Sequence, residues 1–153
     1  MTVVTINVQG LKEVQAQLRK TRDFPREAMP QVLTEAGAIL LNRIRTRFLQ
    51  QTDPNGQKWP ESQAAKDRAA DPTGGGGTLF DTGKLFRSIQ LRKGGTREKL
   101  KRYIYTDVPY GAYHQFGRGQ EQRIFLGFSN GDIKVIERLV QARLLEVLGG
   151  RSG

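Results

Sequence analysis

The stretch PREAMPQVLTEAGAILLNRIRTRFLQ, residues 25–50, carries the clearest periodic pattern in this chain. Its apolar residues recur at intervals of three and four, so that they would line one side of a helix. These residues are Met29, Val32, Leu33, Ala36, Leu40, Ile44 and Phe48. Such a helix would span roughly 37 Å at 1.5 Å per residue. We therefore expect it to be the spine of the fold.

Shorter patterned segments lie on both sides of this helix. Residues 2–8 alternate between apolar and polar side chains, which predicts a half-buried strand, and residues 11–23 predict a short amphipathic helix. From about Asp132 the apolar residues again repeat at helical spacing, which predicts a closing helix. Its apolar side consists of Ile133, Ile136, Leu139, Val140, Leu144 and Val147.

Between residues 51 and 78 this periodicity disappears. The segment contains two Asp-Pro pairs and ends near a run of four glycines, Gly74–Gly77. A glycine-rich segment of this length favours a long flexible loop. We also expect the last five residues, 149–153, to form a disordered tail.

The remaining chain predicts extended structure. Residues 89–92 and 103–106 alternate in the manner of two strands, and residues 93–102 would join them as a hairpin. Residues 124–128 predict a third extended piece. The order β-α-α-loop-β-β-β-α is typical of an α+β fold. We therefore expect a small, mostly antiparallel sheet packed against about three helices.

Amino-acid composition limits the number of domains in this chain and the kinds of functional site that it can contain. The 153 residues, 37% of them hydrophobic, suffice for one core but not comfortably for two, so we expect a single domain over residues 1–153. The absence of cysteine excludes a disulfide scaffold, a thiol nucleophile and a cysteine-type zinc site. A single histidine, His114, rules out a multi-histidine metal site within one chain. We expect no cofactor.

Membrane and secretory segments are not expected either. The apolar stretches are only a few residues long, whereas a membrane-spanning helix needs about 20. The first residues lack the basic region, apolar run and small-residue cleavage site of a secretory signal. We therefore expect synthesis inside a cell.

Positive charge is concentrated in one part of the chain. The net charge is +10, and residues 84–102 hold eight basic residues against Glu98 alone. Such a segment favours a polyanion or an acidic protein surface as its partner. The candidate contacts are Lys93, Arg97, Lys99, Lys101 and Arg102. Because exposed charges contribute little to stability, we expect the joint neutralisation of Arg97, Lys99, Lys101 and Arg102 to leave the fold intact.

The tripeptide Asp81-Thr82-Gly83 has two interpretations. It is the tripeptide that carries the catalytic carboxylate of aspartic proteases, and a homodimer would pair two such aspartates. That class is almost wholly β, however, whereas the helical patterns dominate here, so the protease interpretation is disfavoured. In the second interpretation, Asp81 or Thr82 caps the turn before Leu85, and Gly83 supplies a backbone conformation that strains other residues.

The aromatic segment from Tyr110 to Gly117 contains the single histidine. In such surroundings His114 is more often a structural residue than a catalyst. Trp59 follows a polar loop, where a tryptophan either covers the edge of the core or anchors an interface. Residue chemistry alone leaves both roles of Trp59 open.

Four separated motifs form an ordered series. They are DPNGQKW at 53–59, LFDTGKLFRSI at 79–89, VPYGAYHQFG at 108–117 and RIFLGFS at 123–129. Together with Phe48 this series resembles the virion morphogenesis and tail-completion proteins of tailed bacteriophages, most closely the Mu-like form. The short, proline-free segment 118–124 departs from the family pattern. The motifs contain the candidate interface or structural residues Trp59, Asp81, Gly83, Tyr110, His114 and Phe116.

The resemblance implies a non-enzymatic structural protein of the phage neck. Such proteins form a ring, here expected to be hexameric, that joins head to tail or completes the tail as its terminator. The implied partners are other copies, head-completion or connector proteins, tail tube proteins and, non-specifically, genomic DNA in the channel. We expect assembly in the host cytoplasm and a final location in the virion. A basic nucleic-acid-binding module is the alternative, and a homodimeric aspartic protease is a remote third.

Overall fold

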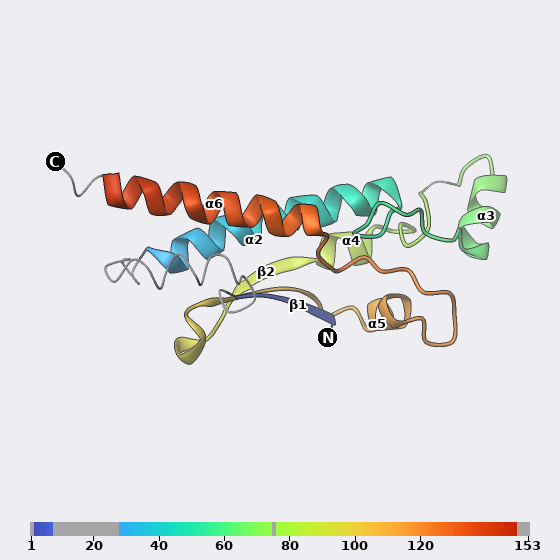
Figure 1. Ribbon diagram of the computed structural model, residues 1–153. Helices are drawn as coiled ribbons and strands as arrows, with labels where there is room; N and C mark the ends of the chain where they lie inside the picture. Colours follow the sequence, from blue (N-terminus) through green and yellow to red (C-terminus); the bar gives the residue numbers. More distant parts are fainter. Residues whose placement is uncertain (1, 8–27, 75, 150–153) are drawn as a thin grey trace. The chain divides into compact units, whose positions relative to one another are not determined.

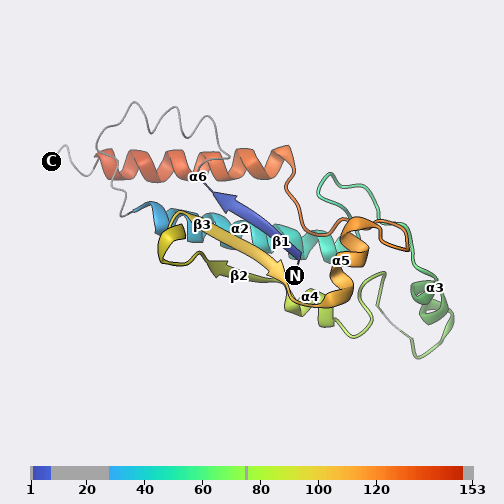
Figure 2. The same cartoon turned by 90° about the horizontal axis from the view of Figure 1, so that it is seen from below.

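The computed structural model describes residues 2–7, 28–74 and 76–149 (Figure 1). Within these ranges lie three strands: β1 (Thr2–Asn7), β2 (Gln90–Lys93) and β3 (Lys101–Thr106). The same ranges contain five α-helices: α2 (Met29–Gln50), α3 (Gln63–Ala70), α4 (Lys84–Ser88), α5 (Pro109–Phe116) and α6 (Asn130–Gly149). The strands form an antiparallel sheet with β3 in the middle, as Figure 2 shows. The predicted α+β class is confirmed.

The predicted spine and closing helix are both present. All seven apolar residues of the predicted stripe on α2 are buried. α6 begins two residues before the predicted start, because Ser129 and Asp132 cap it reciprocally. The Ser129 amide donates to the Asp132 carboxylate at 2.8 Å, and the Asp132 amide donates to the Ser129 hydroxyl at 3.1 Å. The predicted helix over 11–23 lies outside the described residues. Of the predicted tail, 149–153, Gly149 is the last residue of α6, and residues 150–153 lie outside the described residues.

The third strand predicted at 124–128 is wrong. In the described chain this segment belongs to no sheet, and β1 is the third strand instead. The amides of Phe125 and Leu126 donate to Oε1 of Gln115 at 3.1 and 3.0 Å. The Gln115 side chain returns a hydrogen bond from Nε2 to the Leu126 carbonyl at 2.7 Å. A side chain on α5 thus satisfies backbone groups that a neighbouring strand would otherwise pair.

Besides the five-residue α4, two helices lie where the sequence pattern predicts none. α3 interrupts the segment 51–78, which was expected to be a loop throughout, and starts where the Ser62 hydroxyl accepts from the Ala65 amide at 3.1 Å. α5 starts with Pro109 and ends at Gly117, whose φ of +66° is left-handed. Each helix has only eight residues, too few for a convincing periodic pattern.

Residue contacts divide the chain into two compact units that alternate along the sequence. Unit 1 comprises 1–4, 41–90 and 104–127, and unit 2 comprises 5–40, 91–103 and 128–153. Helix α2 therefore contributes its C-terminal part to unit 1 and its N-terminal part to unit 2.

The core of unit 1 is aromatic. The ring of Phe48 lies edge-on to Trp59 at a centroid distance of 5.1 Å and to Phe125 at 5.9 Å. Phe80 and Phe86 also pack on Phe48, at 6.4 and 5.7 Å. Edge-to-face ring pairs add to the stabilisation that burial provides.

The core of unit 2 is aliphatic. From α2 it draws Met29, Val32, Leu33, Ala36 and Leu40, and from α6 it draws Ile136, Val140 and Leu144. Arg143 on α6 forms an ion pair with Glu35 on α2 at 2.9 Å. Gly37 lets Leu91 of β2 approach α2 closely, because a Cβ at position 37 would lie 2.7 Å from the leucine Cδ1.

Candidate functional site

Arg102, predicted to face a partner, is buried instead. Its Nε donates to the Thr34 hydroxyl at 2.9 Å, and its Nη2 donates to the Pro30 carbonyl. Its Nη1 donates to the carbonyls of Lys99 and Lys101 at 3.0 and 2.8 Å. Burial lowers the pKa of the guanidinium below its ordinary value. Arg102 therefore ties the hairpin to the first turns of α2 and is not part of the exposed basic surface.

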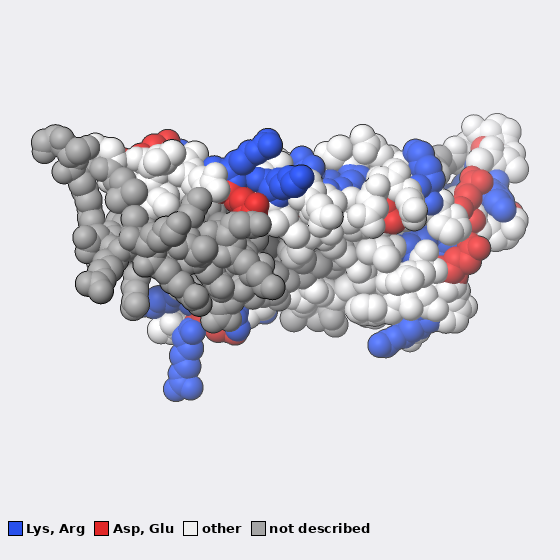
Figure 3. All heavy atoms as spheres, in the orientation of Figure 1, with Lys and Arg blue, Asp and Glu red and all other residues white. Residues whose placement is uncertain are grey.

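Exposed positive charge remains at the far end of the hairpin. Lys93, Arg97 and Lys99 are exposed there, and a short 3-10 turn, Thr96–Glu98, forms the bend. Basic side chains extend from this end of the hairpin in Figure 3. Leu100 lies beside them with 43% of its surface exposed. The hairpin end thus combines cations with an apolar side chain.

The acidic residue of the hairpin is engaged within the hairpin itself. A hydrogen bond from Tyr103 and one from Lys101 lower the pKa of Glu98. The Lys101 ammonium lies 3.2 Å from the Glu98 carboxylate, and this hydrogen bond raises the pKa of Lys101. Lys101 therefore neutralises Glu98, and the outward charge of the bend is that of Arg97 and Lys99.

The turn before α4 matches the predicted role of Gly83. This glycine has a left-handed φ of +71°, and a Cβ there would lie 2.8 Å from Nη1 of Arg87. The hydroxyl of Thr82 accepts a long hydrogen bond of 3.4 Å from the Lys84 amide. Asp81 has an exposed carboxylate that lies 3.8 Å from Nε of Arg68 on α3. Of the two proposed caps, Thr82 is the one that contacts the start of the helix.

Helix α5 presents a line of exposed aromatic side chains. Tyr110, Tyr113 and Phe116 are 41%, 53% and 57% exposed and follow one another at intervals of three, which places them along one side of the helix. We call these three residues the aromatic ridge. The opposite side packs through Gly111, where a Cβ would lie 3.2 Å from Leu85.

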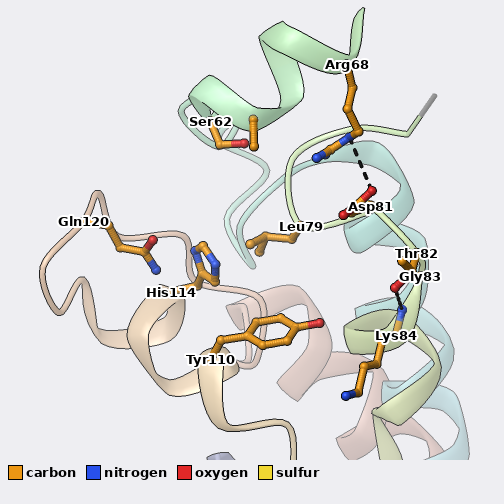
Figure 4. A pocket seen from close by; sticks show the side chains of 11 residues that line it. Ser62, Arg68, Leu79, Asp81, Thr82, Gly83, Lys84, Tyr110, His114 and Gln120 are labelled. Atoms are coloured by element: carbon orange, nitrogen blue, oxygen red, sulfur yellow. Dashed lines mark hydrogen bonds and ion pairs between the residues drawn. The ribbon is translucent and has the colours of Figure 1, made fainter. Parts of the chain in front are cut away.

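Four of the predicted residues meet at one pocket in unit 1. Asp81, Gly83, Tyr110 and His114 line a pocket of about 630 Å³. Figure 4 shows Tyr110 and His114 pointing into it from α5, while Arg68 reaches from α3 towards Asp81. Lys84 and Arg68 contribute positive charge to the lining, and the Asp81 carboxylate offsets that of Arg68.

The single histidine has a structural setting in this pocket. Burial, and secondly the positive charge of Arg123, lower the pKa of His114. Its Nδ1 is buried and has no hydrogen-bond partner among the described residues. The His114 carbonyl accepts from the Arg123 amide at 2.8 Å, and the Arg123 Nε donates to the Pro60 carbonyl at 2.7 Å. The neutral imidazole is therefore favoured.

The other predicted residues lie elsewhere. Trp59 is buried against Phe48, and its indole N–H donates to the Ile124 carbonyl at 2.9 Å. Of its two proposed roles, the structure assigns it to the core. Phe116 belongs to the ridge but not to the pocket lining.

Sequence reasoning missed two exposed residues of these surfaces. Tyr113 would have emerged from the helical register of α5, since it lies three residues from both Tyr110 and Phe116. The exposure of Leu100 could not be predicted from the sequence, because only the folded chain determines which side of a hairpin end faces solvent.

Within the described ranges, no group of three or more His, Asp or Glu side chains could hold a metal ion. None of the helices within 28–74 and 76–149 is both long enough and apolar enough to cross a membrane.

Comparison with known proteins gives one match. Residues 6–145, a range that includes the aromatic ridge, the pocket and the hairpin, match the phage virion morphogenesis family. Neither curated proteins nor solved structures gave a match. Because the match covers most of the chain, this protein belongs to the phage virion morphogenesis family.

Proposed function

We propose that this chain is a structural protein of the virion that forms a hexameric ring at the joint between head and tail and completes the tail. Membership of the phage virion morphogenesis family supports a role in building the particle. The similarity of the four motifs to Mu-like tail-completion proteins supports the neck as its place. Its proposed partners are neighbouring copies, head-completion or connector proteins and tail tube proteins. It has no catalytic role in this proposal.

The aromatic ridge is the structural observation that supports this proposal most strongly. Tyr113 and Phe116 are more than half exposed, although α5 itself is held firmly by Gly111 and by the hydrogen bonds of Gln115. Aromatic side chains are enriched at protein interfaces, where their burial stabilises association. A firmly held helix that exposes them is suited to contact with another protein.

A ring also requires each copy to present two different surfaces, because a head-to-tail contact closes into a ring only when unlike surfaces meet. Unit 1 offers the ridge, and unit 2 offers the basic hairpin end with Lys93, Arg97 and Lys99. The two surfaces differ in chemistry, as such a contact demands.

Purified virions provide the test. We expect immunogold labelling at the neck and a fixed hexameric copy number, measured by mass spectrometry with isotope-labelled reference peptides. Particles that lack the protein should accumulate as separate heads and tails, and the added protein should restore joining. Absence of the chain from virions, or a monomeric or two-fold copy number in them, would refute the ring.

Nucleic-acid binding is the second candidate, and the exposed cations of the hairpin end favour it. If Lys93, Arg97 and Lys99 contact phosphates, DNA affinity should fall with salt, with a logarithmic slope of about −0.9 for each phosphate neutralised. The triple change of these residues to Gln should then flatten the slope. A protein that is absent from virions yet shows this dependence would be a nucleic-acid-binding module.

A further inference from the structure

We propose that the hairpin end of one copy, residues 96–100, docks on the aromatic ridge of the next copy. This inference rests on the proposed ring, for which it supplies the repeating contact. The occupant of the ridge is therefore a second copy of this chain, through Arg97, Lys99 and Leu100.

The ridge is a firm platform for such a contact. Gly111 allows α5 to lie close to Leu85 and Thr106, where a Cβ would approach both to 3.2 Å. Gln115 fixes the same helix to Phe125 and Leu126 through three hydrogen bonds. Little ordering of the backbone is needed when a partner arrives, which favours binding.

The hairpin end is held in a comparable way. Arg102 attaches it to α2 through two hydrogen bonds and binds the carbonyls of Lys99 and Lys101 through two more, and Lys101 engages the Glu98 carboxylate. What the bend presents outward is the exposed surface of Arg97 and Lys99 with the partly exposed Leu100.

These two surfaces complement each other chemically. The faces of aromatic rings attract cations, arginine above all, and the ring carbons accept an apolar side chain. Both unit 1 and unit 2 already use this pairing. Arg118 stacks over Phe116 at 5.4 Å from the ring centre, and Arg92 stacks over Tyr103 at 4.8 Å. Because Arg118 already covers Phe116, the incoming cations would meet the exposed rings of Tyr110 and Tyr113.

A protein surface fits this combination better than DNA does. Phosphate groups would pair with Arg97 and Lys99, but they offer no contact for Leu100. A second copy uses both surfaces at once, and because they are unlike, the contact repeats from copy to copy until the ring closes.

Disulfide crosslinking tests the contact directly, since the natural chain has no cysteine. Phage particles are assembled from an equal mixture of Leu100→Cys and Tyr113→Cys chains and then oxidised. A crosslinked dimer on non-reducing gels is the expected result, and in such a mixture it can form only between copies. Chains that carry both changes should give a ladder that ends at the size of the ring.

Leu49→Cys paired with Leu100→Cys is the matched control, because Leu49 is 60% exposed but lies on α2. The control pair should remain uncrosslinked. A ring of the expected copy number in which only the control pair crosslinks would overturn the docking proposal and leave the proposed function standing. Absence of the chain from virions would instead overturn the ring, and the docking contact with it.

A second pair of variants separates protein contact from DNA contact. Tyr113→Ala with Phe116→Ala should weaken incorporation into particles at least about tenfold, and Arg97→Gln with Lys99→Gln should do the same, because both remove one half of one interface. Circular dichroism checks that each variant is folded. If only the hairpin variant fails, and it also loses DNA affinity, the hairpin end binds DNA and the proposal is refuted.

Discussion

The core of unit 1 is built from aromatic rings around Phe48, whereas the core of unit 2 is built from aliphatic side chains on α2 and α6. The backbone differs in the same way. The described residues of unit 2 are mostly regular helix and hairpin, but in unit 1 long stretches of loop are tied down by the side chains of Trp59, Gln115 and Arg123. Regular structure satisfies its own backbone, while loops depend on single residues. Unit 1 should therefore be more sensitive to individual substitutions.

Truncation of the central ring should have the largest effect. Phe48→Ala removes four ring contacts in unit 1 and leaves a cavity, which is expected to lower the free energy of unfolding by about 3–5 kcal/mol. Chemical denaturation measures the change. Leu49→Ala, at the exposed neighbouring position, should stay within about 0.5 kcal/mol. Equal losses in both variants would show that Phe48 is not the centre of this core.

The buried cation of unit 2 provides the next test. Arg102→Met keeps much of the side-chain volume but leaves the Thr34 hydroxyl and the Pro30 carbonyl without this donor, which should cost about 1.5–3 kcal/mol. The exposed Arg97→Met should cost less than about 0.5 kcal/mol. If the two variants unfold at the same denaturant concentration, Arg102 is a surface charge, as the sequence alone predicted.

Gln115→Leu tests whether one side chain replaces a strand. The change removes the acceptor for the Phe125 and Leu126 amides and should cost about 1–3 kcal/mol. Hydrogen exchange of these two amides should accelerate by about tenfold or more, since 1.4 kcal/mol corresponds to a factor of ten. Gln120→Leu, at an exposed loop position, serves as the control and should leave both exchange rates unchanged.

Two substitutions in the turn before α4 distinguish a requirement for the backbone conformation of Gly83 from a chemical role of the Asp81 carboxylate. Gly83→Val places a branched side chain at a positive φ and against Arg87, and should cost about 1–3 kcal/mol and reduce infectivity. Asp81→Asn changes an exposed carboxylate and should be tolerated within about 0.5 kcal/mol. Correctly assembled but non-infectious Asp81→Asn particles would revive the protease hypothesis.

The smallest expected effect is a dependence of folding stability on pH, which arises from His114 in unit 1. Burial and Arg123 lower the pKa of folded His114 below its ordinary value of 6.5, so the unfolded chain binds the proton first as pH falls. This contribution to stability is complete above about pH 6.5 and is lost as the pH falls from there through the folded pKa. The His114→Gln variant has no imidazole at this position that could take up a proton. The loss of stability between about pH 7.5 and about pH 5.5 should therefore be smaller in the variant than in the natural chain.

The two long helices and the strands could be predicted, because their signals are local, whereas the short helices α3, α4 and α5 could not. The stripe on α2 and the alternation in β2 and β3 arise from residues within one element, and burial of one face explains both. The strand predicted at 124–128 failed because extended backbone can be satisfied by a side chain as well as by a strand. Gln115 is ten residues away in sequence from Phe125, and no local pattern links them.

Among the candidate site residues, too, those with a local signal could be assigned from sequence and those that depend on distant contacts could not. Gly83 could be assigned from sequence, because a tight turn before a helix demands a residue that tolerates positive φ. Arg102 could not, because its burial depends on acceptors at Pro30 and Thr34, about 70 residues earlier in the chain.

The amino-acid sequence by itself determined the spine helix, the hairpin, the positive charge and the resemblance to phage morphogenesis proteins. These properties follow from composition, short-range periodicity and ordered motifs, which need no knowledge of distant contacts. Only the tertiary structure decided that Arg102 and Trp59 are buried while Tyr113, Phe116 and Leu100 face outward. The physical reason is that exposure depends on which segments pack together. Identical residue types therefore stabilise the fold at one position and remain available to a partner at another.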